Sequence, residues 1–225
     1  MKKAIIFDAG TIINFSINGL LDLFERLKKL FKGEFLITED VKYEVVKRPL
    51  NVKKFELSAL RVHQLIKEGT IKMPSSLGVT DNEIEKRTKE ILNVANKTFI
   101  ARGSYLHLID RGEASCLALS EILTRKGISN VISVDERTLR MLCENPENLR
   151  RLMETKFHTK LVAKKQNYQE FSKFRIIRSA ELVYIAYKNR LVEIGNGMLL
   201  DALLYAIKYK GCSISNEEIE KMKRL

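Results

Sequence analysis

The apolar pattern is clearest between Gly112 and Arg137, where it changes from a helical period to a strand period. From Ala114 to Leu123 the apolar residues recur at the spacing of one helix face, and Gly127 follows as a stop signal. The segment Val131 to Val134 is largely β-branched and apolar, which predicts a buried strand. In an α/β unit such a helix runs antiparallel to the strand, so the start of the helix and the end of the strand share one sheet edge.

Acidic residues stand where the predicted elements reach that edge. Glu113 lies at the start of the helix and Asp135 follows the strand, while Lys3 to Phe7 (KAIIF) predicts a first, central strand that Asp8 follows. The carboxyl ends of parallel strands meet at one edge, where open α/β sheets place their sites. We therefore expect Asp8, Glu113 and Asp135 to lie on one rim.

A fourth acidic residue follows a second predicted strand, Glu34 to Ile37. Thr38 has the residue type of an N-cap for a helix that carries Glu39, Asp40 and Glu44. Glu44 lies about a turn and a half into this helix, and we expect it to reach sideways toward the rim.

The rest of the chain is mostly helical in pattern and indicates an α/β protein. Capping boxes at Thr80 and Ser215 predict two helix starts, and Asn145-Pro146 predicts a break. The expected helices lie at about 17–31, 54–68, 80–97, 138–143, 180–189 and 198–210, with a possible strand at 70–73 and a last strand at 174–177.

Length and composition are those of an ordinary folded protein. The chain has 225 residues, of which 45% are hydrophobic and 30% charged, enough for one domain with its own core. No apolar run approaches the roughly 18 residues of a membrane span, and the start of the chain has no signal-peptide pattern, so we expect a soluble, cytoplasmic protein. Cys116, Cys143 and Cys212 lie in apolar contexts, which favours buried free thiols.

The net charge of +12 favours a polyanionic partner such as RNA. Lys and Arg gather between residues 150 and 178, interleaved with aromatic residues that could stack on unpaired bases. The equally weighted alternative is a solvated helix face whose aromatic rings pack inward. The candidate nucleic-acid-binding residues are Arg150, Arg151, Lys156, Lys160, Lys164, Lys165, Lys173 and Arg175.

Several carboxylates on one rim repel one another, which raises their pKa values unless a cation neutralises them. Oxygen ligands suit a hard divalent ion, so the pattern favours Mg²⁺ or Mn²⁺. Taken singly, each acidic residue has a simpler role: a turn or helix cap, a partner of the helix dipole, or a solvated side chain. Asp110 and Glu136 are reserve ligands, and Ser133 could orient a carboxylate or a bound water.

These acidic segments resemble the four signatures of the PIN domain. They are D-A-x-x-I-I from Asp8, YEVV around Glu44, GEASCLALS around Glu113 and S-V-D ending at Asp135. The tail from about 173 also resembles that of stand-alone prokaryotic and archaeal PIN proteins. The resemblance implies a single domain over residues 1–225, a three-layer α/β/α sandwich with a central, mostly parallel sheet of four or five strands. Residues 50–104 and a basic helical stretch at 145–173 would be insertions.

The resemblance also implies an activity, the metal-dependent hydrolysis of RNA phosphodiester bonds by a ribonuclease. Asp8 and Asp135 would be direct ligands of Mg²⁺ or Mn²⁺, Glu113 a direct or water-mediated ligand, and Glu44 a group behind the ligands or a base. By analogy with the family, the chain could form a homodimer.

Three other interpretations remain open at the level of sequence. The chain could be a PIN-like module that binds RNA without cutting it. It could be the toxin of a toxin-antitoxin pair, in which an antitoxin-like protein inserts a basic side chain into the acidic site. More remotely, FDAGT resembles the start of haloacid-dehalogenase phosphatases, although Gly10 stands where that family has its second aspartate.

Overall fold

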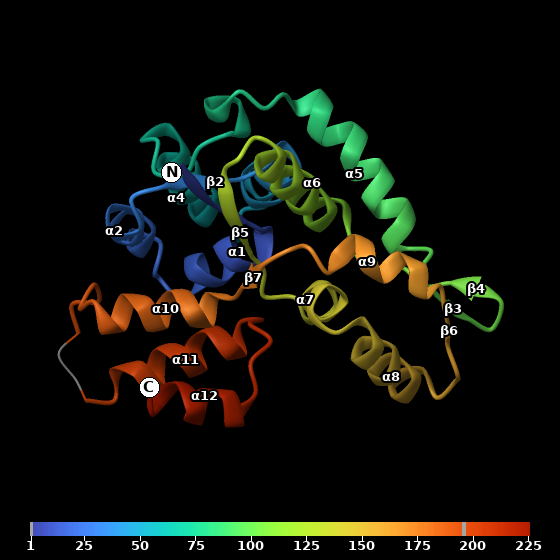
Figure 1. The fold of residues 1–225 in the computed structure, drawn as a ribbon. Helices are drawn as coiled ribbons and strands as arrows, with labels where there is room; N and C mark the ends of the chain where they lie inside the picture. The colour runs from blue at the N-terminus through green and yellow to red at the C-terminus, as the bar shows by residue number, and fades with distance from the viewer. Residues whose placement is uncertain (1, 195–196) are drawn as a thin grey trace.

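Four short parallel strands form the centre of the fold (Figure 1). The computed structural model describes residues 2–194 and 197–225. The strands lie in the order β2-β1-β5-β7, so the first strand is central, as predicted. Their bounds are β1 Lys3–Phe7, β2 Glu34–Leu36, β5 Ser129–Ser133 and β7 Ile176–Ile177. In register, Ile5 of β1 pairs with Phe35 on one side and Val131 on the other.

Helices cover the sheet on both faces and complete a three-layer α/β/α sandwich, which confirms the predicted fold class. The helix α6, Arg111–Arg125, packs against β1 and β5 and is buried along most of its length. The helix α10, Ser179–Lys188, contacts β7 and also α1, Ala9–Ile17, and α2, Asp22–Phe31.

The first helix begins earlier than the sequence pattern predicted. The expected single helix at 17–31 is wrong, because α1 starts at Ala9, directly after β1. The side chain of Asp8 accepts a hydrogen bond of 3.1 Å from the backbone N–H of Gly10 and so caps α1 at the end of the strand. Gly19, with φ of +69°, then separates α1 from α2.

The segment after β2 follows the prediction closely. The hydroxyl of Thr38 accepts a bond of 3.2 Å from the N–H of Val41 and caps the short helix α3, Glu39–Lys42. The chain continues into one π-helical turn, η1, Tyr43–Lys47, which carries Glu44. The strand suggested at 70–73 is reduced to a single bridge between Leu36 and Lys72.

A second, antiparallel sheet joins the two stretches that were expected to be insertions. It has the order β4-β3-β6, with β3 Phe99–Ala101, β4 Ser104–Tyr105 and β6 Val162–Ala163. Arg102 and Gly103 both have positive φ, of 49° and 82°, as a tight hairpin turn requires. Residues 50–104 and 145–173 therefore meet in one substructure, which the sequence pattern did not indicate.

The helices expected at 54–68, 80–97, 138–143, 180–189 and 198–210 are present, with bounds within two residues of those predicted. Both capping boxes are present, Thr80 with Glu83 and Ser215 with Glu218. The other elements are η2 Pro49–Asn51, α4 Glu56–Lys67, η3 Pro74–Leu77, α5 Asp81–Ala95, α7 Arg137–Glu144, α8 Pro146–Phe157, η4 Lys165–Asn167, α9 Tyr168–Phe171, α11 Leu199–Tyr209 and α12 Asn216–Lys223.

Two further expectations concern the cysteines and the helix lengths. Cys116, Cys143 and Cys212 are buried free thiols, as their apolar contexts indicated. Within residues 2–194 and 197–225, none of the helices combines the length and the apolar character that crossing a bilayer demands.

Aromatic packing supports the strand that carries the first acidic residue. Phe7, the last residue of β1, packs edge-on against Phe24 and Phe35, with ring centroids 4.9 and 5.0 Å apart, and Phe15 lies 5.1 Å from Phe24. All four rings are essentially inaccessible to solvent. This cluster fixes the position of Phe7 and therefore of the Asp8 backbone, from which the carboxyl group extends.

We predict that Phe24→Ala lowers the free energy of unfolding by about 3–5 kcal/mol, because it leaves a cavity among these rings. Urea unfolding followed by circular dichroism measures the change. Phe157→Ala is the matched control, since this ring is 41% exposed, and it should change stability by no more than about 0.5 kcal/mol. Equal losses in the two variants would contradict the assignment of the core.

Candidate functional site

Asp8 and Asp135 follow adjacent strands and lie at the same sheet edge. The N–H of Asp8 donates to the carbonyl of Ser133 at 3.0 Å, which extends the pairing of β1 and β5 to the edge. A Cβ atom placed on Gly10 would lie 3.3 Å from Asp8 Oδ2 and 4.0 Å from Asp135 Cβ, so Gly10 borders both acids. Burial raises the pKa of Asp8 to about 6, although hydrogen bonds from the backbone N–H groups of Gly10 and Ala9 lower it. The charge of Asp135 adds to the increase.

The Asp135 carboxylate is held by polar groups from two other elements. Ser179, at the start of α10, donates to it through its backbone N–H and its hydroxyl, both at 2.8 Å. The side-chain amide of Asn14 donates to it at 3.0 Å. Asn14 and Ser179 are completely buried, so these bonds fix the carboxylate in place.

Asn14 and Ser179 were not among the predicted site residues. A signal for Asn14 was available, because it is a polar residue between the apolar residues Ile13 and Phe15. Ser179 gave no such signal, since a serine at the start of a helix is commonly a cap.

Glu113 lies in the first turn of α6, and its two carboxyl oxygens differ in hydrogen bonding. One oxygen, Oε2, accepts a bond of 2.8 Å from the N–H of Asp110, as part of a capping box. The other, Oε1, is buried and has no hydrogen-bond partner within the described residues. Burial, followed by the charge of Asp8, raises the pKa of Glu113 to about 8.

Glu44 reaches the start of the same helix from η1. A Cβ atom on Gly112 would lie 2.5 Å from Glu44 Oε1, so only glycine leaves room for this carboxyl group. Burial is the main cause that raises the pKa of Glu44 to about 7, and the charge of Asp8 adds to it while Arg48 opposes it. The structure thus brings Glu44 sideways to the N-terminus of α6, next to Gly112, the residue that precedes Glu113.

The reserve residues and Ser133 have other partners. Asp110 is exposed and lies 2.8 Å from a ring nitrogen of His107. Glu136 accepts a bond of 3.0 Å from the N–H of Leu139 and caps α7. The hydroxyl of Ser133 is buried 3.1 Å from that of Thr11, so it pairs with a hydroxyl rather than with a carboxylate.

The acidic rim, defined as Asp8, Glu44, Glu113 and Asp135, has the donor chemistry for a hard cation. In the part of the chain that the structure describes, no three His, Cys, Asp or Glu side chains are arranged as a ready metal cluster. The buried Glu113 Oε1 nevertheless lacks a donor, and three of the four carboxyl groups have raised pKa values. A divalent cation with oxygen ligands matches both features.

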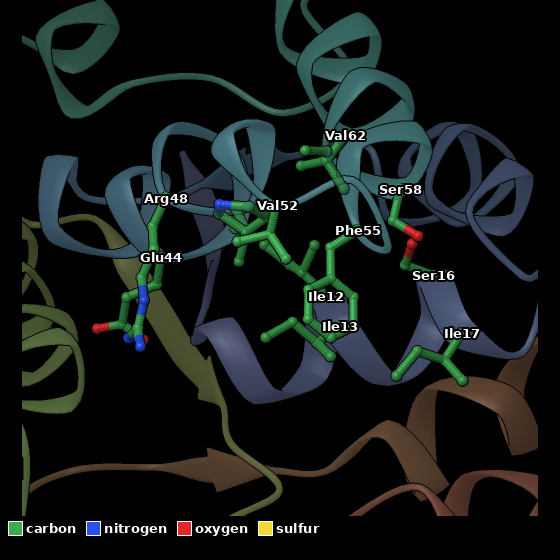
Figure 2. Close-up of a pocket in the computed structure, with 13 residues that line it drawn as sticks. Ile12, Ile13, Ser16, Ile17, Glu44, Arg48, Val52, Phe55, Ser58 and Val62 are labelled. Atoms are coloured by element: carbon green, nitrogen blue, oxygen red, sulfur yellow. The ribbon is translucent and has the colours of Figure 1, made fainter.

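An apolar pocket of about 340 Å³ adjoins the rim at Glu44. It lies between α1, η1 and the start of α4, and Figure 2 shows Glu44 and Arg48 together at one end of it. Ile12, Ile13 and Phe55 lie in its middle. Phe55 is 44% exposed, so its ring is accessible from solvent.

The basic stretch predicted to bind RNA is partly engaged within the protein. Arg150 pairs with Glu147 and Glu154 at 2.7 and 2.6 Å, and Lys173 with Glu121 at 3.0 Å. The Lys164 ammonium donates to the hydroxyl of Tyr105 at 2.6 Å. Exposed cations that form no ion pair with any described residue are Arg151, Lys156, Lys160, Lys165 and Arg175.

The aromatic residues of this stretch do not form a stacking surface. Phe171 and Phe174 are buried, and Tyr168 packs edge-on against Phe99. Phe157 remains exposed. The inward-packing alternative is therefore correct for Tyr168, Phe171 and Phe174.

Comparison of the chain with models of protein families, with curated proteins and with solved structures gives no match.

The raised pKa of Glu113 predicts how stability depends on pH. Its carboxyl group has a pKa of about 8 when folded and an ordinary value of 4.5, so between these values unfolding releases a proton and stability falls as the pH rises. Below about 4.5 this effect is absent. In chelator, Glu113→Gln should therefore flatten the decline of the melting temperature between about pH 5 and pH 8.

Glu217→Gln on the exposed surface of α12 is the control for this experiment and should keep the wild-type slope. A Glu113→Gln variant with the same slope as the wild-type protein would show that Glu113 is ionised at neutral pH and would contradict its assigned environment.

Proposed function

We propose that this protein is a metal-dependent ribonuclease of the PIN type, which hydrolyses phosphodiester bonds of RNA in the cytoplasm. The observation that carries the proposal is the convergence of Asp8, Glu44, Glu113 and Asp135 at the carboxyl edge of β1 and β5. Their order and sequence context, which resemble the PIN signatures, support the same conclusion. The net charge of +12 supports a polyanionic substrate.

Asp8, Glu113 and Asp135 would hold Mg²⁺ or Mn²⁺. When bound there, the ion supplies a Lewis acid that polarises a phosphate oxygen and lowers the pKa of a water molecule. Asn14 and Ser179 hold the Asp135 carboxylate in one position, so it would bind the ion without a change of side-chain conformation. Glu113 gives up its proton when a positive charge binds, because the charge removes the cause of its raised pKa.

Glu44 is suited to proton transfer. Its pKa of about 7 lies near neutral pH, where a carboxyl group can both accept and return a proton. It lies at the border between the acidic rim and the apolar pocket, with Arg48 beside it. We assign it the role of a base that takes the proton of the attacking water.

A specific observation also favours a protein partner at this site. The apolar pocket ends at Glu44, so a partner with apolar side chains followed by a basic one would fill the pocket and neutralise the rim. This is the arrangement expected of an antitoxin-like protein. RNA binding without metal-dependent cleavage would instead favour a non-catalytic module.

We predict that the purified protein cleaves a labelled single-stranded RNA with Mn²⁺ or Mg²⁺ and not with chelator. Asp8→Asn and Glu113→Gln should each lower the rate about 100-fold or more, since each removes a carboxylate ligand of the proposed metal ion. Both substitutions keep an oxygen that can accept the capping hydrogen bond, so the fold is preserved. Cleavage is measured by gel electrophoresis under single-turnover conditions.

Asp22→Asn, on the exposed first turn of α2, is the matched control and should cleave at the wild-type rate. Cleavage that persists in chelator, or in both rim variants, would rule out the proposed chemistry.

A further inference from the structure

A basic pocket of about 430 Å³ adjoins the backbone that follows Asp135. It is formed by α7, the end of α11 and the segment that leads into α12, three elements that lie near one another in the lower half of Figure 1. The polar residues that line it are Arg137, Arg140, Lys208, Ser213, Ser215 and Glu218. None of the residues predicted from sequence to bind nucleic acid belongs to it.

The charges of this pocket are unbalanced. Three cations line it, and its single acidic residue, Glu218, is already paired with the buried Arg178 at 2.8 Å. Arg137 is exposed and forms no ion pair or side-chain hydrogen bond with any described residue. It also lies in the first turn of α7, where the helix dipole disfavours a positive charge. An anion bound at this end of α7 would interact favourably with both the Arg137 guanidinium and the helix dipole.

Arg140 faces the same pocket with its hydrogen-bonding groups only partly satisfied. Its Nη2 lies 3.4 Å from the carbonyl oxygen of Ser213, and its Nη1 lies 3.6 Å from Glu144. Its Nε is buried without a hydrogen-bond partner among the described residues. Arg137 and Arg140 are three residues apart on α7 and so lie on one face of the helix.

The pocket and the acidic rim share the backbone at Asp135. The N–H of Ser213 donates to the Asp135 carbonyl at 3.0 Å, and Arg137 follows Asp135 by two residues. A strand of nucleic acid that passes the rim would meet repulsion from the carboxylates there. Cations directly beside the rim would offset that repulsion and hold the strand in place.

We propose that this pocket, here called the phosphate pocket, binds a backbone phosphate of the RNA strand next to the bond at the acidic rim. The inference rests on the proposed ribonuclease function and adds the element that positions the substrate. The guanidinium groups of Arg137 and Arg140 suit a phosphate because they present paired N–H donors, and Lys208 adds a third charge. The hydroxyl group of Ser215 lies at the pocket and can donate to a phosphate oxygen.

The test is the affinity for a short labelled single-stranded RNA in chelator, measured by fluorescence anisotropy at several salt concentrations. Arg137→Gln combined with Arg140→Gln should weaken binding at least tenfold. The slope of log affinity against log salt should fall by about 0.7 for each phosphate that the variant no longer neutralises. Arg137→Gln alone should weaken binding less, and because this side chain is exposed the single variant should fold normally.

Arg61→Gln combined with Lys67→Gln removes the same charge from the exposed surface of α4 and is the matched control. Its affinity should stay within twofold of the wild-type value. Equal affinities of the pocket variant and the wild-type protein, equal reductions in the pocket and control variants, or no RNA binding by the wild-type protein would each overturn the proposal.

Failure of the phosphate-pocket proposal can be distinguished from failure of the ribonuclease proposal. RNA binding that depends on the phosphate pocket, without metal-dependent cleavage, would keep the pocket and reject the nuclease. Metal-dependent cleavage with affinity and KM unchanged in the pocket variant would keep the nuclease and reject the pocket.

Discussion

The burial of carboxyl groups at one sheet edge governs the chemistry of the site, and their mutual repulsion adds a smaller contribution. Asp8, Glu44 and Glu113 all have raised pKa values, and burial is the main cause in each case. Each pKa unit corresponds to about 1.4 kcal/mol of preference for the neutral form. A folded protein that keeps such groups together retains an unfavourable arrangement, which a bound cation turns into a favourable one.

The fold maintains this arrangement with small residues and a rigid support. Gly112 leaves the space that Glu44 occupies, and Gly10 lies between the aspartates. The ring of Phe7 packs against those of Phe24 and Phe35, which holds the end of β1, and with it the backbone of Asp8, in a fixed position. The packing of the core thus offsets the unfavourable free energy of burying these carboxyl groups together.

The positions of Asp8, Glu113 and Asp135 at one sheet edge could be predicted from the sequence because these residues adjoin regular elements. Asp8 and Asp135 follow buried strands, and Glu113 begins a helix, so the topology of an α/β sheet was enough to bring them together. The bonds from Asn14 and Ser179 to Asp135 depend on how α1 and α10 pack, which no local pattern encodes. The second sheet was missed for a similar reason, because two- and three-residue strands carry almost no periodicity.

The basic stretch illustrates the limit of composition as an argument. Counting Lys and Arg between 150 and 178 could not distinguish Arg150, which pairs with two glutamates, from an available cation such as Arg151. In the phosphate pocket the cations come from α7 and α11, which are far apart in sequence, so no local charge count reveals them. Our proposal of the phosphate pocket therefore rests on its position near the rim rather than on charge density along the chain.

We propose to measure the binding of a divalent cation at the acidic rim by calorimetric titration with Mn²⁺. Titrations at pH 7 in two buffers of different ionisation enthalpy give both the affinity and the number of protons released. Since the pKa of Glu113 is about 8 and that of Glu44 about 7, saturable binding should release about one proton or more, and less in Glu113→Gln. Two results would show that the rim is not a cation site of this kind. One is the absence of saturable Mn²⁺ binding, and the other is Mn²⁺ binding that releases no proton and has the same affinity in Glu113→Gln as in the wild-type protein.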